Sequence, residues 1–289
     1  MEQLYEQIGI SRQGFHQYRQ RRQLDRQRVC QLVDRVKQHR INHPRMGARP
    51  MYVLMQSKQE DANLLQEIGR DKLESILLAN DLGVKPIRIF HKTTYAGAFR
   101  FDNLVEGVEV RQLNRVWISD LTYYRLRDGW AYLTFILDLY SRRCIGYQMS
   151  QNMTAHSTTI PALRMALQCR GVDRYEQQLV FHSDGGGQYY DGEFLALLNS
   201  YEVQSSMAEI VYENPHMERF HSTAKNDYLI PWGVNSIGQL QKQIHRFVRL
   251  YNEEKPHRSL KRKTPLAFEA LISQMPEAQR PVVVFKKID

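Results

Sequence analysis

Three acidic residues lie at positions where a carboxylate can do chemistry. Asp120 lies inside a predicted apolar β-strand, where an ionised carboxylate is costly unless it is paired or bound to a metal. Asp184 follows a second predicted strand and precedes three glycines, and the carboxyl ends of strands are where sites gather in open α/β sheets. Glu218 lies in the first turn of a predicted helix, one residue beyond the position at which it would act as a cap.

Each of these carboxylates alone also has an ordinary explanation, namely an edge-strand surface residue, an Asp-Gly turn and a solvated Glu-to-Lys helix face. Together they lie on elements that should pack side by side, and their oxygen ligands suit Mg²⁺ or Mn²⁺. Two such ions roughly 4 Å apart can promote in-line phosphoryl transfer. The sequence contains neither a His/Cys set for zinc nor a phosphate-binding loop for ATP. It therefore predicts nuclease-like or transesterification chemistry on a nucleic-acid backbone.

The elements around these carboxylates predict a mixed α/β sheet flanked by helices. Even-numbered residues from Val116 to Tyr124 share one face of a strand, and the continuously apolar run from Trp130 to Asp138 predicts a central strand. Three meander-like strands followed by alternating helices and strands give the mixed sheet. Further strands are expected at residues 144–149, 179–182 and 203–207, and helices at 154–169, 194–201 and from Pro215.

The first part of the chain is basic and has a helical pattern. Residues 4–8 predict a short helix, Gly9 a turn, and Ser11 the N-cap of a second helix that runs through Arg22. This is the outline of a helix-turn-helix, although plain helical bundles contain the same pattern. A further helix is expected at 71–80. The residues of the second helix expected to contact DNA are Arg12, Gln13, Gln17, Arg19, Arg21 and Arg22.

The composition of the 289 residues fits a protein that acts on nucleic acid. The formal net charge is +9 and the pI is about 9.4, which favours a polyanionic partner. Cys30, Cys144 and Cys169 have no metal-ligand spacing and indicate reduced thiols of a cytoplasmic protein. The most apolar stretch, residues 130–140, is about half as long as a membrane helix, so no membrane association is expected.

The adjacent tyrosines Tyr123 and Tyr124 invite comparison with tyrosine recombinases. That chemistry requires a cluster of Arg and His around the nucleophile, and paired tyrosines in a strand usually pack against their neighbours. We therefore expect a packing role for both.

Five motifs, in a shared order across roughly residues 114–270, resemble the insertion sequence three family of bacterial transposases. The N-terminal half is similar to the helical DNA-binding region of that family, more weakly. The motifs are Trp117-Ile-Ser-Asp120-Leu-Thr122-Tyr123, Leu137-Asp138-Leu-Tyr-Ser141-Arg142-Arg143, His182-Ser-Asp184-Gly-Gly-Gly-Gln188-Tyr189, Glu218 followed by Lys225, and Tyr251-Asn252 with Pro256-His257 and Leu260.

The resemblance implies a ribonuclease-H-like core shared with retroviral integrases. Asp120, Asp184 and Glu218 would form an acidic triad that holds two Mg²⁺ or Mn²⁺ ions. On the same basis the expected domains are a helical, basic DNA-binding region at 1–95, a linker at 96–112, the catalytic core at 113–230, and a C-terminal helical extension with a tail at 231–289.

The activity that the resemblance implies is DNA transposition. A water-derived nucleophile would nick the element end, and the freed 3′-hydroxyl would attack target DNA. Lys225 would contact a DNA phosphate, whereas His182 and Gln188 are expected either to support the site or to be structural. The implied partners are the terminal repeats of the element, target DNA and further copies of this chain on DNA, with an upstream polypeptide of the same element as another candidate.

Three features depart from the pattern of the family. The 33 residues between Asp184 and Glu218 are slightly fewer than is common, and the loop at 205–211 is shortened. Glu213 and Asn214 stand where an Asp-Asn pair is usual, which leaves Glu213 as a less favoured third ligand.

Two other functions stay open at this point. A DNA-binding regulator derived from a transposase would keep the fold without catalysis, although the intact triad argues against this. A simple nuclease of the same fold would cut DNA without joining it.

Overall fold

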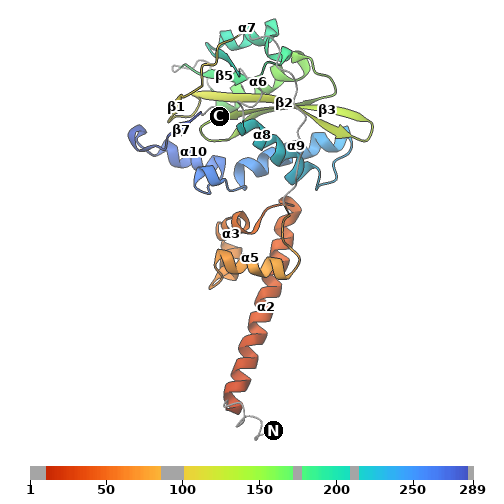
Figure 1. The fold of residues 1–289 in the computed structure, drawn as a ribbon, viewed down its shortest axis with the longest axis vertical. Helices are drawn as coiled ribbons and strands as arrows, with labels where there is room; N and C mark the ends of the chain where they lie inside the picture. The colour runs from red at the N-terminus through yellow and green to blue at the C-terminus, as the bar shows by residue number, and fades with distance from the viewer. Residues whose placement is uncertain (1–10, 86–100, 172–177, 209–214, 286–289) are drawn as a thin grey trace. The chain divides into compact units, whose positions relative to one another are not determined.

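The structure, a computed structural model, describes residues 11–85, 101–171, 178–208 and 215–285. The chain divides into two compact units, Met1–Pro86 and Ile87–Asp289, which Figure 1 colours from red to orange and from yellow to blue. The domain boundary expected at residue 95 lies outside the described residues. None of the described helices combines the length and the hydropathy needed to cross a membrane.

The N-terminal unit is helical, as predicted. Apolar residues of its helices form a small core in which Leu32 and Met51 are fully buried. The buried carboxylate of Asp61 ties the helices together, because it pairs with Arg35 and its Oδ2 lies 2.6 Å from His39 Nε2. The elements are α2 (Arg12–Asn42), α3 (Ala48–Gln56), α4 (Gln59–Ala62), η1 (Asn63–Leu65) and α5 (Arg70–Ala79).

Helix α2 begins where the sequence predicts. The Ser11 hydroxyl accepts a hydrogen bond of 3.0 Å from the backbone N–H of Gly14 and so caps the helix. The helix is 31 residues long and ends at Asn42. It therefore extends far beyond Arg22, the last residue named in the predicted helix. The expected first helix at residues 4–8 and the turn at Gly9 lie outside the described residues, so the helix-turn-helix stays a prediction.

The second unit is built on a five-stranded mixed sheet, as predicted. Strands β2, β3 and β4 pair antiparallel, whereas β5 pairs parallel with both β2 and β6. Strand β5 pairs only with Val116–Ile118 of β2, and among the described residues no strand pairs with the rest of β2 on that side. The spatial order is β4 (Cys144–Ser150), β3 (Gly129–Asp138), β2 (Val116–Leu126), β5 (Val180–Ser183) and β6 (Gln204–Met207).

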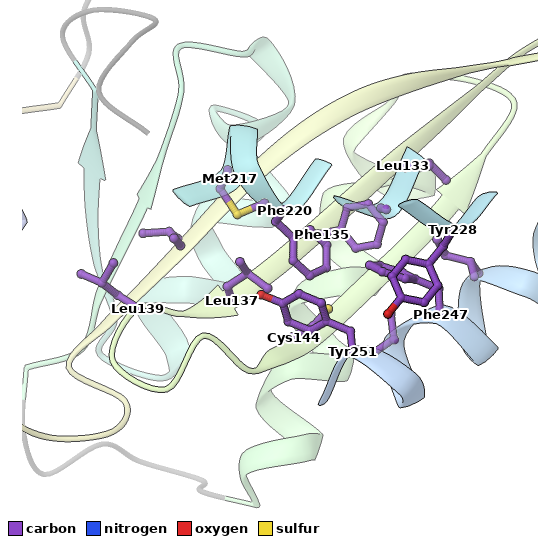
Figure 2. Packing of buried hydrophobic residues seen from close by; sticks show 14 of the residues in the cluster. Leu133, Phe135, Leu137, Leu139, Cys144, Met217, Phe220, Tyr228, Phe247 and Tyr251 are labelled. Carbon is purple, nitrogen blue, oxygen red and sulfur yellow. The ribbon is translucent and has the colours of Figure 1, made fainter. Parts of the chain in front are cut away.

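Helices cover both faces of the sheet (Figure 1). Gly146 of β4 lets α6 approach closely, because a Cβ there would overlap the carbonyl oxygen of Ala162. On the other face, Phe220 packs edge to face on Phe135 and Phe247, with ring centroids 4.8 and 5.4 Å apart (Figure 2). One face carries α6 (Thr159–Arg170) and α7 (Gly192–Ser200), and the other carries α8 (Pro215–Ser222), α9 (Ile237–Glu253) and α10 (Pro265–Ser273).

The helix expected from Pro215 onward changes its winding after eight residues. Helix α8 is followed directly by the π-helix η5 (Thr223–Leu229). Because a π-helix has wider turns than an α-helix, residue spacing along this segment does not follow the pattern assumed from the sequence. The remaining single turns are η2 (Ala155–Ser157), η3 (Gly187–Tyr189), η6 (Arg258–Leu260) and η7 (Glu277–Gln279).

A pair of two-residue strands joins the beginning of the second unit to its end. Strand β1 (Glu109–Val110) pairs antiparallel with β7 (Val283–Val284). Strand β1 falls within the segment 96–112 that the sequence predicts to be a linker. The end of that segment is therefore built into the second unit.

A buried ion network ties the C-terminal helices to the sheet. Arg170 lies 3.1 Å from the Asp138 carboxylate of β3 and 2.8 Å from the Glu269 carboxylate of α10. Arg143 also lies 2.7 Å from Glu269. The side chains of Arg170 and Asp138 are only 6% and 0% exposed, so these charges are neutralised inside the protein.

Candidate active site

The structure brings Asp120 and Asp184 to the same edge of the sheet. Ile118 of β2 and His182 of β5 are register partners in a parallel pair. Asp120 follows by two residues within β2, and Asp184 follows by two residues, directly after the end of β5. The charge of Asp184 acts on Asp120 and raises its pKa. This is the point where β5 ends and β2 continues without a partner.

The loop after β5 holds the Asp184 carboxylate. The backbone N–H of Gly186 donates a hydrogen bond of 3.1 Å to Asp184 Oδ1. A Cβ at Gly186 would overlap Gln188 Nε2 and would lie 3.0 Å from Asp184 Oδ1. Because glycine has no side chain, position 186 leaves room for the Gln188 amide beside the Asp184 carboxylate. Whether Gln188 supports the site or is structural stays a prediction.

Helix α8 crosses the same edge and carries Glu218 and His221. The Glu218 side chain is exposed, and its charge also raises the pKa of Asp120. His221 is buried, and its Nδ1 lies 3.4 Å from Asp120 Oδ2. The N-cap expected at Asn214 and the alternative ligand Glu213 lie outside the described residues.

Lys225 reaches from η5 to strand β2. Its Nζ donates a hydrogen bond of 2.6 Å to Thr122 Oγ1. Thr122 lies two residues beyond Asp120 along β2, on the same face of the strand. Burial lowers the pKa of Lys225 to about 8, and the charge of Asp120 opposes that shift. Lys225 therefore lies beside the carboxylates, but through the π-helical segment and not through the regular α-helical face expected.

The electrostatics of the site are those of crowded carboxylates. Burial raises the pKa of Asp120 well above its ordinary value, and the Asp184 charge raises it further. The N–H of Leu121 and the ammonium of Lys225 partly oppose this shift. Burial also raises the pKa of Asp184, against the hydrogen bond from Gly186. A cation placed between two such groups would relieve their mutual repulsion.

The donor atoms of these carboxylates suit a hard divalent cation, which prefers oxygen ligands. Within the described ranges, no three His, Cys, Asp or Glu side chains already lie close enough together to hold one ion. Asp120 and Asp184 form a pair, whereas Glu218 is exposed. Binding of one ion by all three carboxylates therefore stays a prediction.

His182, the other supporting candidate, lies inside the second unit. It is 0% exposed, its Nδ1 lies 3.0 Å from Ser206 Oγ, and its ring packs on Phe285 with centroids 5.3 Å apart. Burial lowers its pKa to about 4. These contacts favour the structural alternative, in which His182 stabilises the β5–β6 pair.

The residues expected to contact DNA from the N-terminal unit lie on α2. The side chains of Gln13, Gln17, Arg19, Arg21 and Arg22 are exposed, and the side chain of Arg12 lies outside what the structure describes. The buried residues of α2 begin only at Leu32. The first turns of α2 therefore present polar and basic side chains to solvent, which is compatible with phosphate contacts.

His221 is the residue of this site that the sequence reasoning missed. It follows Glu218 by three residues, a spacing that places both on the same side of an α-helix. Burial lowers the pKa of His221 to about 3 and the Lys225 charge adds to this, while a hydrogen bond to the Asp120 backbone acts in the opposite direction. A neutral imidazole beside Asp120 can donate a hydrogen bond to the carboxylate without neutralising it.

Comparison with known proteins places this site in a described family of domains. Residues 110–211 match a family model described as an integrase core domain. Residues 210–265 match a second model with the same description. The chain is 30% identical over 275 residues to the insertion element IS600 uncharacterized 31 kDa protein of Shigella sonnei. The aligned residues cover 93% of this chain and 98% of that protein.

Two further similarities cover less of the chain. Transposase InsF for insertion sequence IS3A of Escherichia coli (strain K12) is 38% identical over 114 residues, which are 39% of this chain and 38% of InsF. The HTLV-2 integrase catalytic core domain superposes with a TM-score of 0.44 at 20% identity, over 57% of this chain and 98% of that one.

Proposed function

Because the chain belongs to the insertion sequence three (IS3) family of transposases, whose general function is DNA transposition, we propose that it catalyses both chemical steps of that process. In the first step it cleaves DNA at the ends of the insertion sequence. In the second it transfers the free 3′-hydroxyl into target DNA by in-line phosphoryl transfer. The fold is the integrase-type α/β core predicted from the sequence.

The observation that carries this proposal is the placement of Asp120 and Asp184 at the point where β5 ends. Two buried carboxylates with raised pKa values, one of them raised further by the charge of the other, are unfavourable for folding and favourable for binding a cation. Asp120, Asp184 and Glu218 would hold Mg²⁺ or Mn²⁺, with two ions per site. The bound ions would supply Lewis acidity and stabilise charge on the attacking and leaving oxygens.

The other side chains of the site would position the carboxylates and the DNA. Gly186 holds Asp184 by its N–H, and Gln188 lies beside that carboxylate. His221 contacts Asp120 from α8. Lys225, held by Thr122, would contact a DNA phosphate while keeping this hydrogen bond, since a lysine ammonium has three donors.

The remaining parts of the proposal concern partners. Exposed residues at the start of α2, Gln13 to Arg22, would contact the terminal repeats of the element. Two ends must be joined in one reaction, so we propose that copies of the chain assemble on DNA, with or without an upstream polypeptide of the same element. The reaction would take place in the cytoplasm.

The test is a strand-transfer assay with labelled duplexes that carry the terminal sequences flanking the reading frame, in Mg²⁺ or Mn²⁺. Joined products should form with the native chain and be lost in Asp120→Asn, Asp184→Asn and Glu218→Gln. Glu193→Gln, which changes an exposed carboxylate of α7, is the matched control and should retain activity. DNA binding without cleavage would indicate a regulator, and cleavage without joining a nuclease.

A further inference from the structure

An exposed aromatic pair lies on the β2–β3 hairpin beside the candidate active site. The side chains of Tyr123 and Trp130 are 52% and 46% exposed. The neighbouring Tyr124 is buried, and its hydroxyl donates a hydrogen bond of 2.9 Å to the carbonyl of Val234. The packing role expected for both tyrosines is therefore found for Tyr124, whereas Tyr123 keeps half of its surface in solvent.

Two cations frame this aromatic pair. The rings of Tyr123 and Trp130 lie edge to face, with centroids 5.2 Å apart and planes at 84°. The Arg125 guanidinium carbon lies 4.9 Å from the centroid of Trp130, its cross-strand partner. The Lys225 ammonium lies 5.0 Å from the Tyr123 centroid. We call these four side chains the aromatic step.

The aromatic step has the chemistry of a surface for unpaired nucleic acid. Aromatic faces stack on bases of any sequence, and nearby cations attract the phosphates on either side. Duplex DNA would use the cations but would hide its base faces inside the stack. An apolar protein partner would use the rings but would leave Arg125 and Lys225 without counter-charges.

The aromatic step is also connected to the carboxylates. Tyr123 follows Asp120 by three residues along β2 and so points to the opposite face of the strand, on the part of β2 whose edge β5 leaves unpaired. Lys225 belongs to both places, since it contacts Thr122 and Tyr123 and its charge acts on Asp120. DNA bound at the carboxylates would therefore pass the aromatic step within a few nucleotides.

We propose that the aromatic step binds an unpaired DNA base next to the scissile phosphate, by stacking on Tyr123 and Trp130. This inference rests on the proposed function for the position of the scissile phosphate. The stacking itself does not depend on catalysis, so it can be measured separately. Its consequence is that DNA frayed next to the cleavage position should be a better ligand than fully paired DNA.

The test uses the fluorescence of Trp130, one of three tryptophans in the chain. The probe is a single-stranded thymidine oligonucleotide, compared with a duplex of equal length, and the protein is the full chain carrying Asp120→Asn so that no cleavage occurs. We expect saturable quenching by the single strand that persists at about 0.3 M salt, because salt weakens phosphate contacts much more than stacking. The duplex should quench weakly.

Variants then assign the effect to the aromatic step. Trp130→Phe should abolish the quenching while single-strand affinity, measured by anisotropy, stays within about twofold, because phenylalanine still stacks. The double variant Tyr123→Ala/Trp130→Ala should bind the single strand about tenfold to a hundredfold more weakly, with little change for the duplex. Both side chains are exposed, so its melting temperature should stay close to that of the parent.

Quenching that remains in Trp130→Phe, or unchanged single-strand affinity in the double alanine variant, would overturn the proposal. These outcomes are separate from the strand-transfer result. A chain that stacks on DNA without joining it would contradict the transposase proposal alone. A chain that joins DNA while the double variant binds normally would contradict the aromatic step alone.

Discussion

Two pairs of carboxylates, each with one member on a strand of the same sheet, have opposite surroundings. Asp138 and Glu269 are enclosed with Arg170, which lies within 3.1 Å of both, and Arg143 adds a second cation. Asp120 and Asp184 lie where β5 ends, and the cation that offsets the charge of Asp120 is Lys225, whose hydrogen bond goes to Thr122 instead.

The pKa values of Glu269 and Asp120 differ in direction, while burial raises the pKa of Asp138 against its pairing with Arg170. Although burial acts to raise it, the pKa of Glu269 is lowered by its hydrogen bonds and charge pairing with Arg170. The pKa of Asp120 is raised well above its ordinary value by burial and by the charge of Asp184. Asp138 and Glu269 are neutralised by arginines of the protein itself, and we call these residues the complete cluster. Asp120 and Asp184 would gain from a cation supplied by solution, and we call their site the incomplete cluster.

The largest effect should come from removing the arginine of the complete cluster. Arg170→Met would leave Asp138 and Glu269 buried without their shared cation, and breaking a buried pair in this way costs about 3–5 kcal/mol. Urea unfolding measures this loss in the free energy of unfolding. The matched control is Arg164→Met, since Arg164 and Glu193 are 63% and 49% exposed and such a pair contributes at most about 1 kcal/mol. Equal losses in the two variants would contradict the contrast between the clusters.

A divalent cation should stabilise the protein through the incomplete cluster. At about a hundredfold excess over its dissociation constant, a ligand that binds only the folded state adds about 2.7 kcal/mol. We expect Mg²⁺ or Mn²⁺ to raise the melting temperature relative to EDTA in the native chain and in Arg164→Met. The shift should disappear in Asp120→Asn and Asp184→Asn. A shift of the same size in those two variants would place the ion elsewhere.

The dependence of stability on pH should have opposite signs for Asp120 and Glu269. A carboxylate whose folded-state pKa is raised destabilises the folded protein above that pKa, and the penalty is absent below its unfolded pKa of about 4. Asp120→Asn in EDTA should therefore gain about 1 kcal/mol over the native chain near neutral pH, and nothing near pH 4. The lowered pKa of Glu269 predicts the reverse, because the stability it contributes is present at neutral pH and is lost as the pH falls through that pKa. Urea unfolding of the native chain and of Asp120→Asn, between about pH 4 and neutral pH, measures this difference in the free energy of unfolding. A difference that does not change with pH would contradict the prediction.

The strands and the carboxylates could be predicted because their evidence is local. Alternation along β2 and the apolar run of β3 fix which residues face the helices. The register that brings Asp120 and Asp184 to the same edge follows from a parallel pairing between strands more than sixty residues apart in sequence, but each Asp could be recognised from its own neighbours.

The rest of the site depends on contacts that leave no local pattern. The π-helical winding of η5 decides that Lys225 meets Thr122 and Tyr123, and nothing in the spacing of residues 215–229 indicates it. Strands β1 and β7 pair although most of the second unit lies between them in sequence. Each strand has only two residues, which is too short to show a periodic pattern. The length of α2 was accessible in principle, since Leu32 and Val36 continue an apolar helical spacing.

The smallest effect on stability, and the sharpest comparison within the incomplete cluster, comes from two adjacent glycines. Gly186 has φ −67°, which alanine accepts, but its Cβ would displace the Gln188 amide from beside Asp184. Nothing lies within 4 Å of a Cβ at Gly187. Both alanine variants should change the free energy of unfolding by less than about 1 kcal/mol. Only Gly186→Ala should lower strand transfer, by about tenfold, because small displacements at a reacting centre are costly. Equal activity in the two variants would show that Gln188 does not support Asp184, and the incomplete cluster would then consist of the carboxylates and His221 alone.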